Sequence, residues 1–312
     1  MAGMSFTGLK TEYYIPADTE VVFVQDFFAS ELVGGAELTS DAIIKAAPCK
    51  VFQIHAHSLT ETLVRKNKNK TWVFGNQTMT PPHVLAMFPK LGINYAFFEY
   101  DFKPCIYRST LKHEMAQGSC NCHEYDHGKF MSAWMTHAKA LFWCSKGQQD
   151  KFYRLYPHLQ GATTDIVQGS TFYPETILNI RKVRERKERG ELTIADRWCI
   201  LDSDSWIKGT SDAVEYCKQN GMNYVLLKNL TNEQFLSELA QSKGLVFFPR
   251  DIDVGSRITV ECKLLGGEPI LNDFVLPKFE PWFNSSIPDI EQYFLDGPSR
   301  FWRELDSTLN GR

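Results

Sequence analysis

The sequence lacks the features that mark several classes of protein. No apolar run reaches the roughly 18 residues that a membrane-spanning helix requires, so we expect no membrane span. Residues 1–14 contain no apolar core of signal-peptide length, and we therefore expect a cytoplasmic location. No long low-complexity tract is present. A formal net charge of -3 provides no global positive field for nucleic acid, although the basic cluster at residues 65–70 could contact phosphates.

Disulfide bonds are also not expected. The chain has eight cysteines among 312 residues and no secretion signal, which is typical of reduced thiols rather than of a disulfide framework. An apolar content of 43% and an aromatic content of 13% are enough to bury a substantial core. At this length, two domains are expected.

Short apolar segments that alternate with segments of helical length carry the fold prediction. These segments are rich in β-branched and aromatic residues, and their apolar runs are nearly continuous, which is typical of strands in parallel sheets covered on both faces. We therefore predict an α/β protein built from parallel α/β units. The predicted strands are residues 21–28, 50–56, 71–76, 94–100, 140–145, 197–203, 223–229, 244–249 and 268–273.

A charged segment poor in aromatic residues separates the two groups of strands and marks the predicted domain boundary. The predicted units are an N-terminal α/β domain at 1–173, a charged linker at 174–196, a C-terminal α/β domain at 197–288 and a tail helix at 289–312. We expect the linker to be a solvated connector and the tail to pack against one of the domains.

The stretch "FPRDIDVGSRITVECKLLGG", residues 248–267, contains the most informative pattern. Gly255 and Ser256 resemble a helix entrance, and the free backbone N–H groups of a helix N-terminus can bind a phosphate. Seven residues separate Asp253 from Glu261, which places both carboxylates near that helix start. In the alternative interpretation, Glu261 pairs with Arg257 one turn earlier and Asp253 only caps the helix.

This pattern resembles the donor-binding motif of retaining glycosyltransferases of the GT-B fold. The resemblance implies two Rossmann-like domains that face each other across a cleft, with the domain at 1–173 on the acceptor side and the domain at 197–288 binding the nucleotide sugar. That motif is usually Glu-x7-Glu followed by glycine and proline, whereas here the first acid is Asp253 and Glu268 separates Gly267 from Pro269. The resemblance implies that Asp253 faces the transferred sugar and that Glu261 binds the ribose hydroxyls of the nucleotide. It also implies that the backbone N–H groups of Gly255, Ser256 and Arg257 contact the diphosphate.

Two further segments fit the same family. "SWIKGTSDAVEYC" resembles its Lys-Gly segment, which implies that Lys208 contacts the donor diphosphate. The family usually has an arginine about five residues earlier, where this chain has Ser203, and Arg250 or Arg257 could supply the missing charge. Gly34 and Gly35 follow the first predicted strand, where they permit close approach of the backbone to a ligand or form a plain turn.

The likeness within this family is closest to compact bacteriophage glycosyltransferases, through the segment "FFEYDFKPCIYRS" at 97–109. It implies that Glu99 and Asp101 end a strand at the cleft and orient or deprotonate an acceptor hydroxyl. The alternative is two acids at a solvated strand end. Aromatic residues in this segment could receive a flipped, hydroxymethylated DNA base, so DNA is one expected acceptor. In that case the location is the host cytoplasm.

A cluster of cysteine and histidine residues at 112–130 raises the possibility of a structural zinc ion. The predicted ligands are Cys120, Cys122, His123 and His127, with His113 and Cys105 nearby. Free thiols and surface histidines are the alternative, because C-x-C lacks the usual two-residue spacing. No catalytic metal is expected, because GT-B enzymes as a class do not need a cation for their diphosphate.

The functional prediction is therefore transfer of a sugar from a nucleotide-sugar donor to an acceptor hydroxyl with retention. Two alternatives stay open, a nucleotide-sugar epimerase of the same fold and a binding protein that has lost catalysis. The second is motivated by Asp253 in place of glutamate and by the missing arginine. The sequence names no covalent nucleophile, nucleotide base, sugar or oligomeric state.

Overall fold

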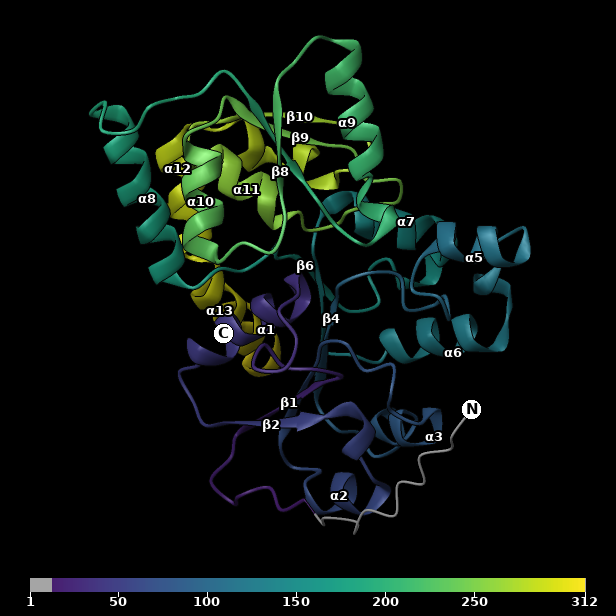
Figure 1. Ribbon diagram of the computed structural model, residues 1–312. Coiled ribbons are helices and arrows are strands. Elements are labelled where there is room, and N and C mark those ends of the chain that lie inside the picture. The colour runs from purple at the N-terminus through teal and green to yellow at the C-terminus, as the bar shows by residue number, and fades with distance from the viewer. Residues whose placement is uncertain (1–12, 312) are drawn as a thin grey trace, which may run out of the picture.

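Two parallel sheets form the framework of the protein (Figure 1). The computed structural model describes residues 13–311, and most of the N-terminal stretch in which we expect no signal peptide lies outside the described residues. The first sheet has six strands in the order β2-β1-β3-β4-β5-β6. Its strands are β1 (Val21–Gln25), β2 (Val51–His55), β3 (Thr71–Phe74), β4 (Tyr95–Glu99), β5 (Ala140–Trp143) and β6 (Thr164–Val167).

Both faces of the first sheet are covered, which explains why its strands are continuously apolar. Val22 and Val24 of β1 belong to one buried cluster, whereas Val21 and Phe23 belong to another on the opposite face. The helices of this half are α1 (Gly35–Lys45), α2 (Glu61–Lys66), α3 (Pro82–Leu85), α4 (Met87–Lys90), α5 (Thr110–Gln117), α6 (Asp126–Met135) and α7 (Lys146–Leu155).

The second sheet has four strands in the order β10-β9-β7-β8. They are β7 (Trp198–Leu201), β8 (Tyr224–Leu227), β9 (Gly244–Phe247) and β10 (Glu268–Leu271). Helix α9 (Thr210–Gln219) covers one face through Ala213 and Cys217. The other face packs against α8 (Pro174–Glu188), α10 (Asn232–Ala240), α11 (Arg257–Leu264) and α12 (Ile287–Leu295).

Helix α8 lies within the segment that we expect to be a charged linker. Its Ile177 and Ile180 are fully buried in the second core, while its outer side carries charged residues. The amphipathic face of α8 therefore packs onto the second sheet rather than running through solvent as a connector. Only residues 189–197 lead from this helix to β7 without helix or strand.

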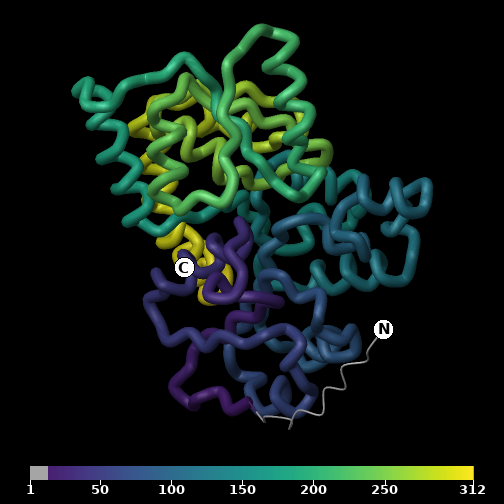
Figure 2. The backbone as a smooth tube through the Cα atoms, in the orientation of Figure 1, coloured from purple at the N-terminus to yellow at the C-terminus, as the bar shows by residue number. Residues whose placement is uncertain are grey.

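The C-terminal tail divides at Gly297 and Pro298, where α13 (Gly297–Asn310) begins. Helix α12 packs in the second core, whereas Phe301, Trp302 and Leu305 of α13 pack against the first sheet. Figure 2 shows the chain returning from the upper lobe to end beside the lower one. The two domains are thus connected by two segments of chain.

All nine predicted strands are present, and each observed bound lies within three residues of the predicted one. The sequence prediction missed β6, a four-residue edge strand whose half-buried residues have no long apolar run. None of the helices in residues 13–311 is long and apolar enough to cross a membrane.

Candidate active site

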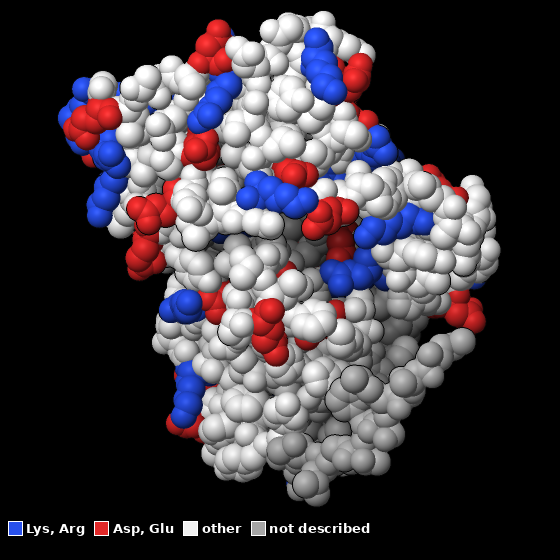
Figure 3. Space-filling view, in the orientation of Figure 1, with Lys and Arg blue, Asp and Glu red and all other residues white. Residues whose placement is uncertain are grey.

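The site lies where the carboxyl ends of both sheets meet. In the second sheet, β8 lies on one side of β7 and β9 on the other, so a crevice opens beyond the ends of β7 and β9. A cavity of about 400 Å³ occupies this place, and loops of the first domain close its other side. Figure 3 shows the surface hollowed between the two lobes, with basic and acidic side chains around the hollow.

An ion pair occupies the second-domain side of the cavity. Lys208 follows β7 in a short 3₁₀ turn, Trp206–Lys208, and its Nζ donates to Asp253 Oδ2 at 2.8 Å. The negative charge of Asp253 raises the pKa of Lys208 above its usual value, so the ammonium stays protonated. The backbone of Asp253 is held in turn, because its N–H donates to Phe274 O and its carbonyl accepts from Leu276 N–H.

Helix α11 begins directly after this ion pair and directs its N-terminus at the cavity. Ser256 is the residue before the helix, but its hydroxyl bonds to Thr259 Oγ1 and does not cap the backbone. The first-turn N–H groups of Arg257 and Ile258, which line the cavity, thus have no side-chain cap within the described chain. Such a helix N-terminus attracts an anion.

Glycine is required at two positions for steric reasons. Gly209, directly after Lys208, has φ of 65°, and a Cβ there would lie 1.7 Å from Phe248 O. Gly255 approaches the first domain closely, since a Cβ would lie 2.7 Å from Ser170 Oγ. That hydroxyl donates to the Gly255 carbonyl. Gly255 thus allows contact between the domains in addition to preceding the helix.

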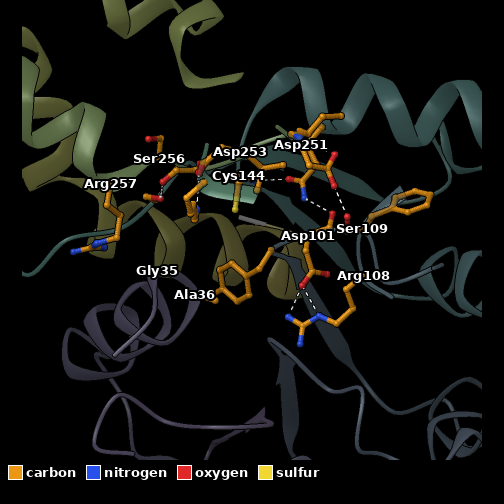
Figure 4. A pocket seen from close by; sticks show the side chains of 18 of the residues that line it. Gly35, Ala36, Asp101, Arg108, Ser109, Cys144, Asp251, Asp253, Ser256 and Arg257 are labelled. Carbon is orange, nitrogen blue, oxygen red and sulfur yellow. Dashed lines mark hydrogen bonds and ion pairs between the residues drawn. The ribbon is translucent and has the colours of Figure 1, made fainter. Parts of the chain in front are cut away.

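Arg257 and Gly35 face each other across the cleft (Figure 4). The guanidinium of Arg257 stacks 3.8 Å from the centroid of Phe172 and donates to Thr171 O. Burial lowers the pKa of Arg257 to about 10, which leaves it charged at neutral pH. Gly35 lines the cavity as the first residue of α1, whereas Gly34 precedes the helix outside the lining.

Glu261 lies one turn along α11 from Arg257 and is only 7% exposed. It does not line the cavity. Burial raises the pKa of Glu261 to about 7, and the positive charge of Arg257 opposes this shift. The structure therefore places Asp253 at the cavity and Glu261 in the interior, outside the cavity lining. Arg250 also lies apart, paired with Asp212 at the surface.

The first-domain side presents Asp101 and Arg108 after β4. Arg108 Nε donates to Asp101 Oδ2 at 2.6 Å, and both residues line the cavity. Although burial opposes ionisation, the charges of Lys103 and Arg108 lower the pKa of Asp101 below its usual value. Glu99 is 1% exposed and accepts from the buried Lys103 at 2.9 Å. It is a buried partner of that lysine and does not line the cavity.

Several cavity residues were not predicted from the sequence. Ser109 donates to Asp251 Oδ2 across the two domains, and Lys151 of α7 lies 4.5 Å from the Phe102 centroid. Cys144 also lines the cavity, and burial raises the pKa of its thiol, so it is a neutral group. Of these missed residues, only Asp251 could have been predicted from the sequence. It lies two residues before Asp253, and residues i and i+2 of an extended segment share a face.

The charged residues of the lining have a positive balance. Four basic residues, Arg108, Lys151, Lys208 and Arg257, face three acids, Asp101, Asp251 and Asp253, which gives a formal charge of +1. The whole chain has a net charge of -3. The lining of the cavity thus differs in sign from the chain as a whole, which favours an anionic ligand.

The predicted metal ligands are only partly brought together. Cys120 and Cys122 converge with Cys105 and His113, whose ligand atoms all lie within 4.8 Å of one another. His123 and His127 lie outside this group of residues. His127 Nε2 bonds to Lys103 O at 2.9 Å, and His123 Nε2 lies 3.8 Å from Glu124 Oε1.

The architecture defines a fold class, two Rossmann-like domains facing across a cleft, which is the GT-B arrangement expected from the sequence. No protein-family model matches the sequence, and no curated protein matches it. Among solved structures, AviGT4, described as a glycosyltransferase involved in avilamycin A biosynthesis, is similar with a TM-score of 0.53 and 9% identity over 94% of this chain and 98% of that chain.

HepE from Anabaena is also similar. Its complex with UDP has a TM-score of 0.56 and 11% identity over 94% of this chain and 100% of that chain. Its complex with UDP-glucose has a TM-score of 0.52 and 10% identity over 94% and 99% of the two chains. At these identities the similarity establishes the fold, and the prediction of the fold class is confirmed.

Proposed function

We propose that this protein is a glycosyltransferase that moves a sugar from a nucleotide-sugar donor to an acceptor hydroxyl with retention of configuration. One observation carries the proposal. Lys208, Asp253 and the N-terminus of α11 surround one cavity at the switch point of the second sheet. The fold shared with AviGT4, a glycosyltransferase, and with HepE, which binds UDP and UDP-glucose, supports this donor class.

The donor diphosphate binds at the start of α11. Uncapped N–H groups and the helix dipole attract its charge there, and the Lys208 ammonium lies nearby, 2.8 Å from Asp253. Arg257 supplies a second positive charge. In the related family an arginine provides that charge, and this chain has Ser203 at the corresponding position. The negative charge that develops on the leaving phosphate is stabilised by these groups.

Asp253 faces the transferred sugar, and its carboxylate accepts hydrogen bonds from hydroxyls of that ring. The nucleotide ribose lies against α11 beside Arg257. Its contact with Glu261 requires this buried carboxylate, which lies outside the cavity lining in the free protein, to turn toward the bound donor. Glu261→Ala should weaken nucleotide binding by about 1.5–3 kcal/mol, the scale of lost charge-assisted hydrogen bonds. An unchanged dissociation constant in a folded variant would make Glu261 a structural residue of the second core.

The acceptor enters from the first domain, between α1 and the loop that follows β4. The lowered pKa of Asp101 makes its carboxylate a weak base, so Asp101 orients the acceptor hydroxyl by accepting its hydrogen bond. Tyr100 and Phe102 line the same wall. On the face shown in Figure 3, basic and acidic side chains of the described residues are interspersed, which favours a small acceptor over a long DNA duplex.

Incubation with a panel of nucleotide sugars tests the proposal. Release of nucleoside diphosphate that rises when an acceptor is added is the expected result, and the anomeric configuration of the product, determined by NMR, tests retention. The acceptor panel includes simple glycosides, a peptide with serine and threonine, and single-stranded and duplex DNA with hydroxymethylated bases.

Two outcomes would contradict transfer. Interconversion of the donor without release of diphosphate would identify an epimerase. Binding of donor without turnover against every acceptor class would favour the inert binding protein. Asp253→Asn serves as the inactive control, because it keeps the size of the side chain and removes the charge next to the sugar.

A further inference from the structure

A cluster of three cysteines and one histidine lies beside the cavity, outside the residues that line it. Cys105 follows β4, His113 lies on α5, and Cys120 and Cys122 lie in the connection from α5 to the 3₁₀ turn Cys122–Glu124. Each residue offers one ligand atom, and the four atoms lie within 4.8 Å of one another. We propose that these residues bind one zinc ion that holds the segment 105–122 in place.

The geometry fits a tetrahedral zinc site. Zinc bound at about 2.3 Å to sulfur and about 2.0 Å to nitrogen separates its ligand atoms by about 3.5–3.8 Å. His113 Nδ1 lies 3.4 Å from Cys105 Sγ and 3.1 Å from Cys122 Sγ. Because the four ligand atoms lie within 4.8 Å of one another, shifts of up to about 1 Å would complete the coordination, and Cys₃His is a common ligand set for structural zinc.

The surroundings of His113 select the nitrogen that would bind the metal. Nε2 lies 3.0 Å from Gln117 Oε1, which can only accept, so Nε2 carries the proton. Nδ1 is then the unprotonated nitrogen, and it is the atom that faces the cysteines. The side-chain amide of Gln117 is held in turn by Tyr107, because Gln117 Nε2 donates to the Tyr107 hydroxyl at 3.2 Å. Such second contacts orient metal-bound histidines in known sites.

The burial of this segment points to the same conclusion. His113 is the single buried residue of α5, and Cys105 and Cys122 are 1% and 4% exposed. By contrast, Ile106 and Met115 are 64% and 68% exposed, so the segment has little apolar anchoring of its own. A segment that buries cysteines and a histidine and has little apolar core of its own is typical of segments that become ordered when they bind a metal.

The zinc site would also support the first-domain wall of the cavity. Arg108 and Ser109 lie between Cys105 and His113 in the sequence, and both line the cavity. Arg108 has φ of 58°, a left-handed conformation that is unfavourable for arginine. Two ligands that bracket this turn would hold it against that preference, and the zinc would act on the chain conformation rather than on the reaction.

Elemental analysis of the purified full-length protein tests the site. We expect about one zinc per chain, and the double variant Cys120→Ser/Cys122→Ser should lose it. Cys49→Ser, a half-buried cysteine outside the cluster, and His123→Ala are the matched controls and should retain the metal. Limited proteolysis should then show new cleavage between residues 105 and 122 when a chelator is added.

A second measurement does not depend on the folding of a variant. Wild-type protein stripped of metal and titrated with Co²⁺ should develop the visible absorption of tetrahedral cobalt bound to thiolates, saturating at one equivalent. Absence of both zinc and this cobalt spectrum would overturn the proposal. So would full zinc content in the double cysteine variant, or a disulfide between cluster cysteines detected by mass spectrometry in the freshly purified protein.

Discussion

Replacing Lys208 with methionine removes one positive charge from the cavity and keeps a side chain of similar length. In the structure the Lys208 ammonium bonds to Asp253 at 2.8 Å, and its side chain is 41% exposed. A proposed diphosphate at the start of α11 would share this ammonium. Lys208→Met should therefore lower kcat/KM for the donor, because charge on the leaving phosphate loses a stabilising partner.

The magnitude follows from the kind of bond that is lost. A hydrogen bond to a charged group contributes about 1.5–3 kcal/mol, and partial exposure moves the value toward the lower end. Because about 1.4 kcal/mol changes a rate constant tenfold, we expect kcat/KM to fall by about ten- to one-hundredfold. The assay is the release of nucleoside diphosphate with the best donor and acceptor from the panels.

Lys243→Met is the matched control. Lys243 is 48% exposed and also pairs with an aspartate, Asp196. It directly precedes β9, at the amino end of the strand, whereas the cavity lies at the carboxyl end. The control should keep wild-type kcat/KM. If both variants keep it, or if both lose it equally while remaining folded, the proposed contact of Lys208 with the diphosphate is wrong.

Three further predictions concern stability. Gly209→Ala should lower the free energy of unfolding in urea by at least about 2 kcal/mol, because the added Cβ would clash with Phe248 O. Gly221→Ala is the control, since its φ is also positive, at 62°, but no atom lies near its Cβ position, and it should cost only about 1–2 kcal/mol. Equal losses in the two variants would refute the clash. Because burial raises the pKa of Glu261 to about 7, the folded state keeps a proton that the unfolded chain releases above about pH 4.5, so stability falls as pH rises toward and through 7. Glu261→Gln should reduce this fall between pH 5 and pH 8 by up to about 3 kcal/mol, and an identical pH profile would count against a buried carboxyl. Trp302→Ala should lower the free energy of unfolding by about 3–5 kcal/mol, because the ring is only 7% exposed, packs on the first sheet and donates from Nε1 to Ile43 O. Phe279 is 63% exposed, so Phe279→Ala should change the free energy of unfolding by no more than about 0.5 kcal/mol.

The fold was more predictable than the site. A strand such as "TWVFGN" reveals itself by a local apolar run, because a strand covered on both faces must be apolar at consecutive positions. The edge strand β6, "TDIV", has no such requirement and was missed. Helix α8 shows the opposite error, because its many charges concealed two buried isoleucines that face the second sheet.

The predicted site residues separate in a similar way. Seven of the predicted site residues meet at one cavity, because they follow strand ends that converge where the two sheets face each other. They are Gly35, Asp101, Lys208, Asp253, Gly255, Ser256 and Arg257. Glu99 and Glu261 carry the same chemistry but are buried. Sequence spacing placed both carboxylates near a strand end or a helix start, yet it could not reveal that Glu99 is buried against Lys103 and that Glu261 is buried outside the cavity lining.

By itself the sequence determined the parallel α/β class, the positions of nine strands and the helix start at Ser256, since each depends on apolar periodicity or on local backbone preference. Only the tertiary structure decided which side chains face one another. Cys105 and His113 join Cys120 and Cys122, while the nearer His123 and His127 turn elsewhere, because the path of the chain around α5 sets these distances. The contact of Ser109 with Asp251 likewise arises from docking of the two domains, which no local pattern encodes.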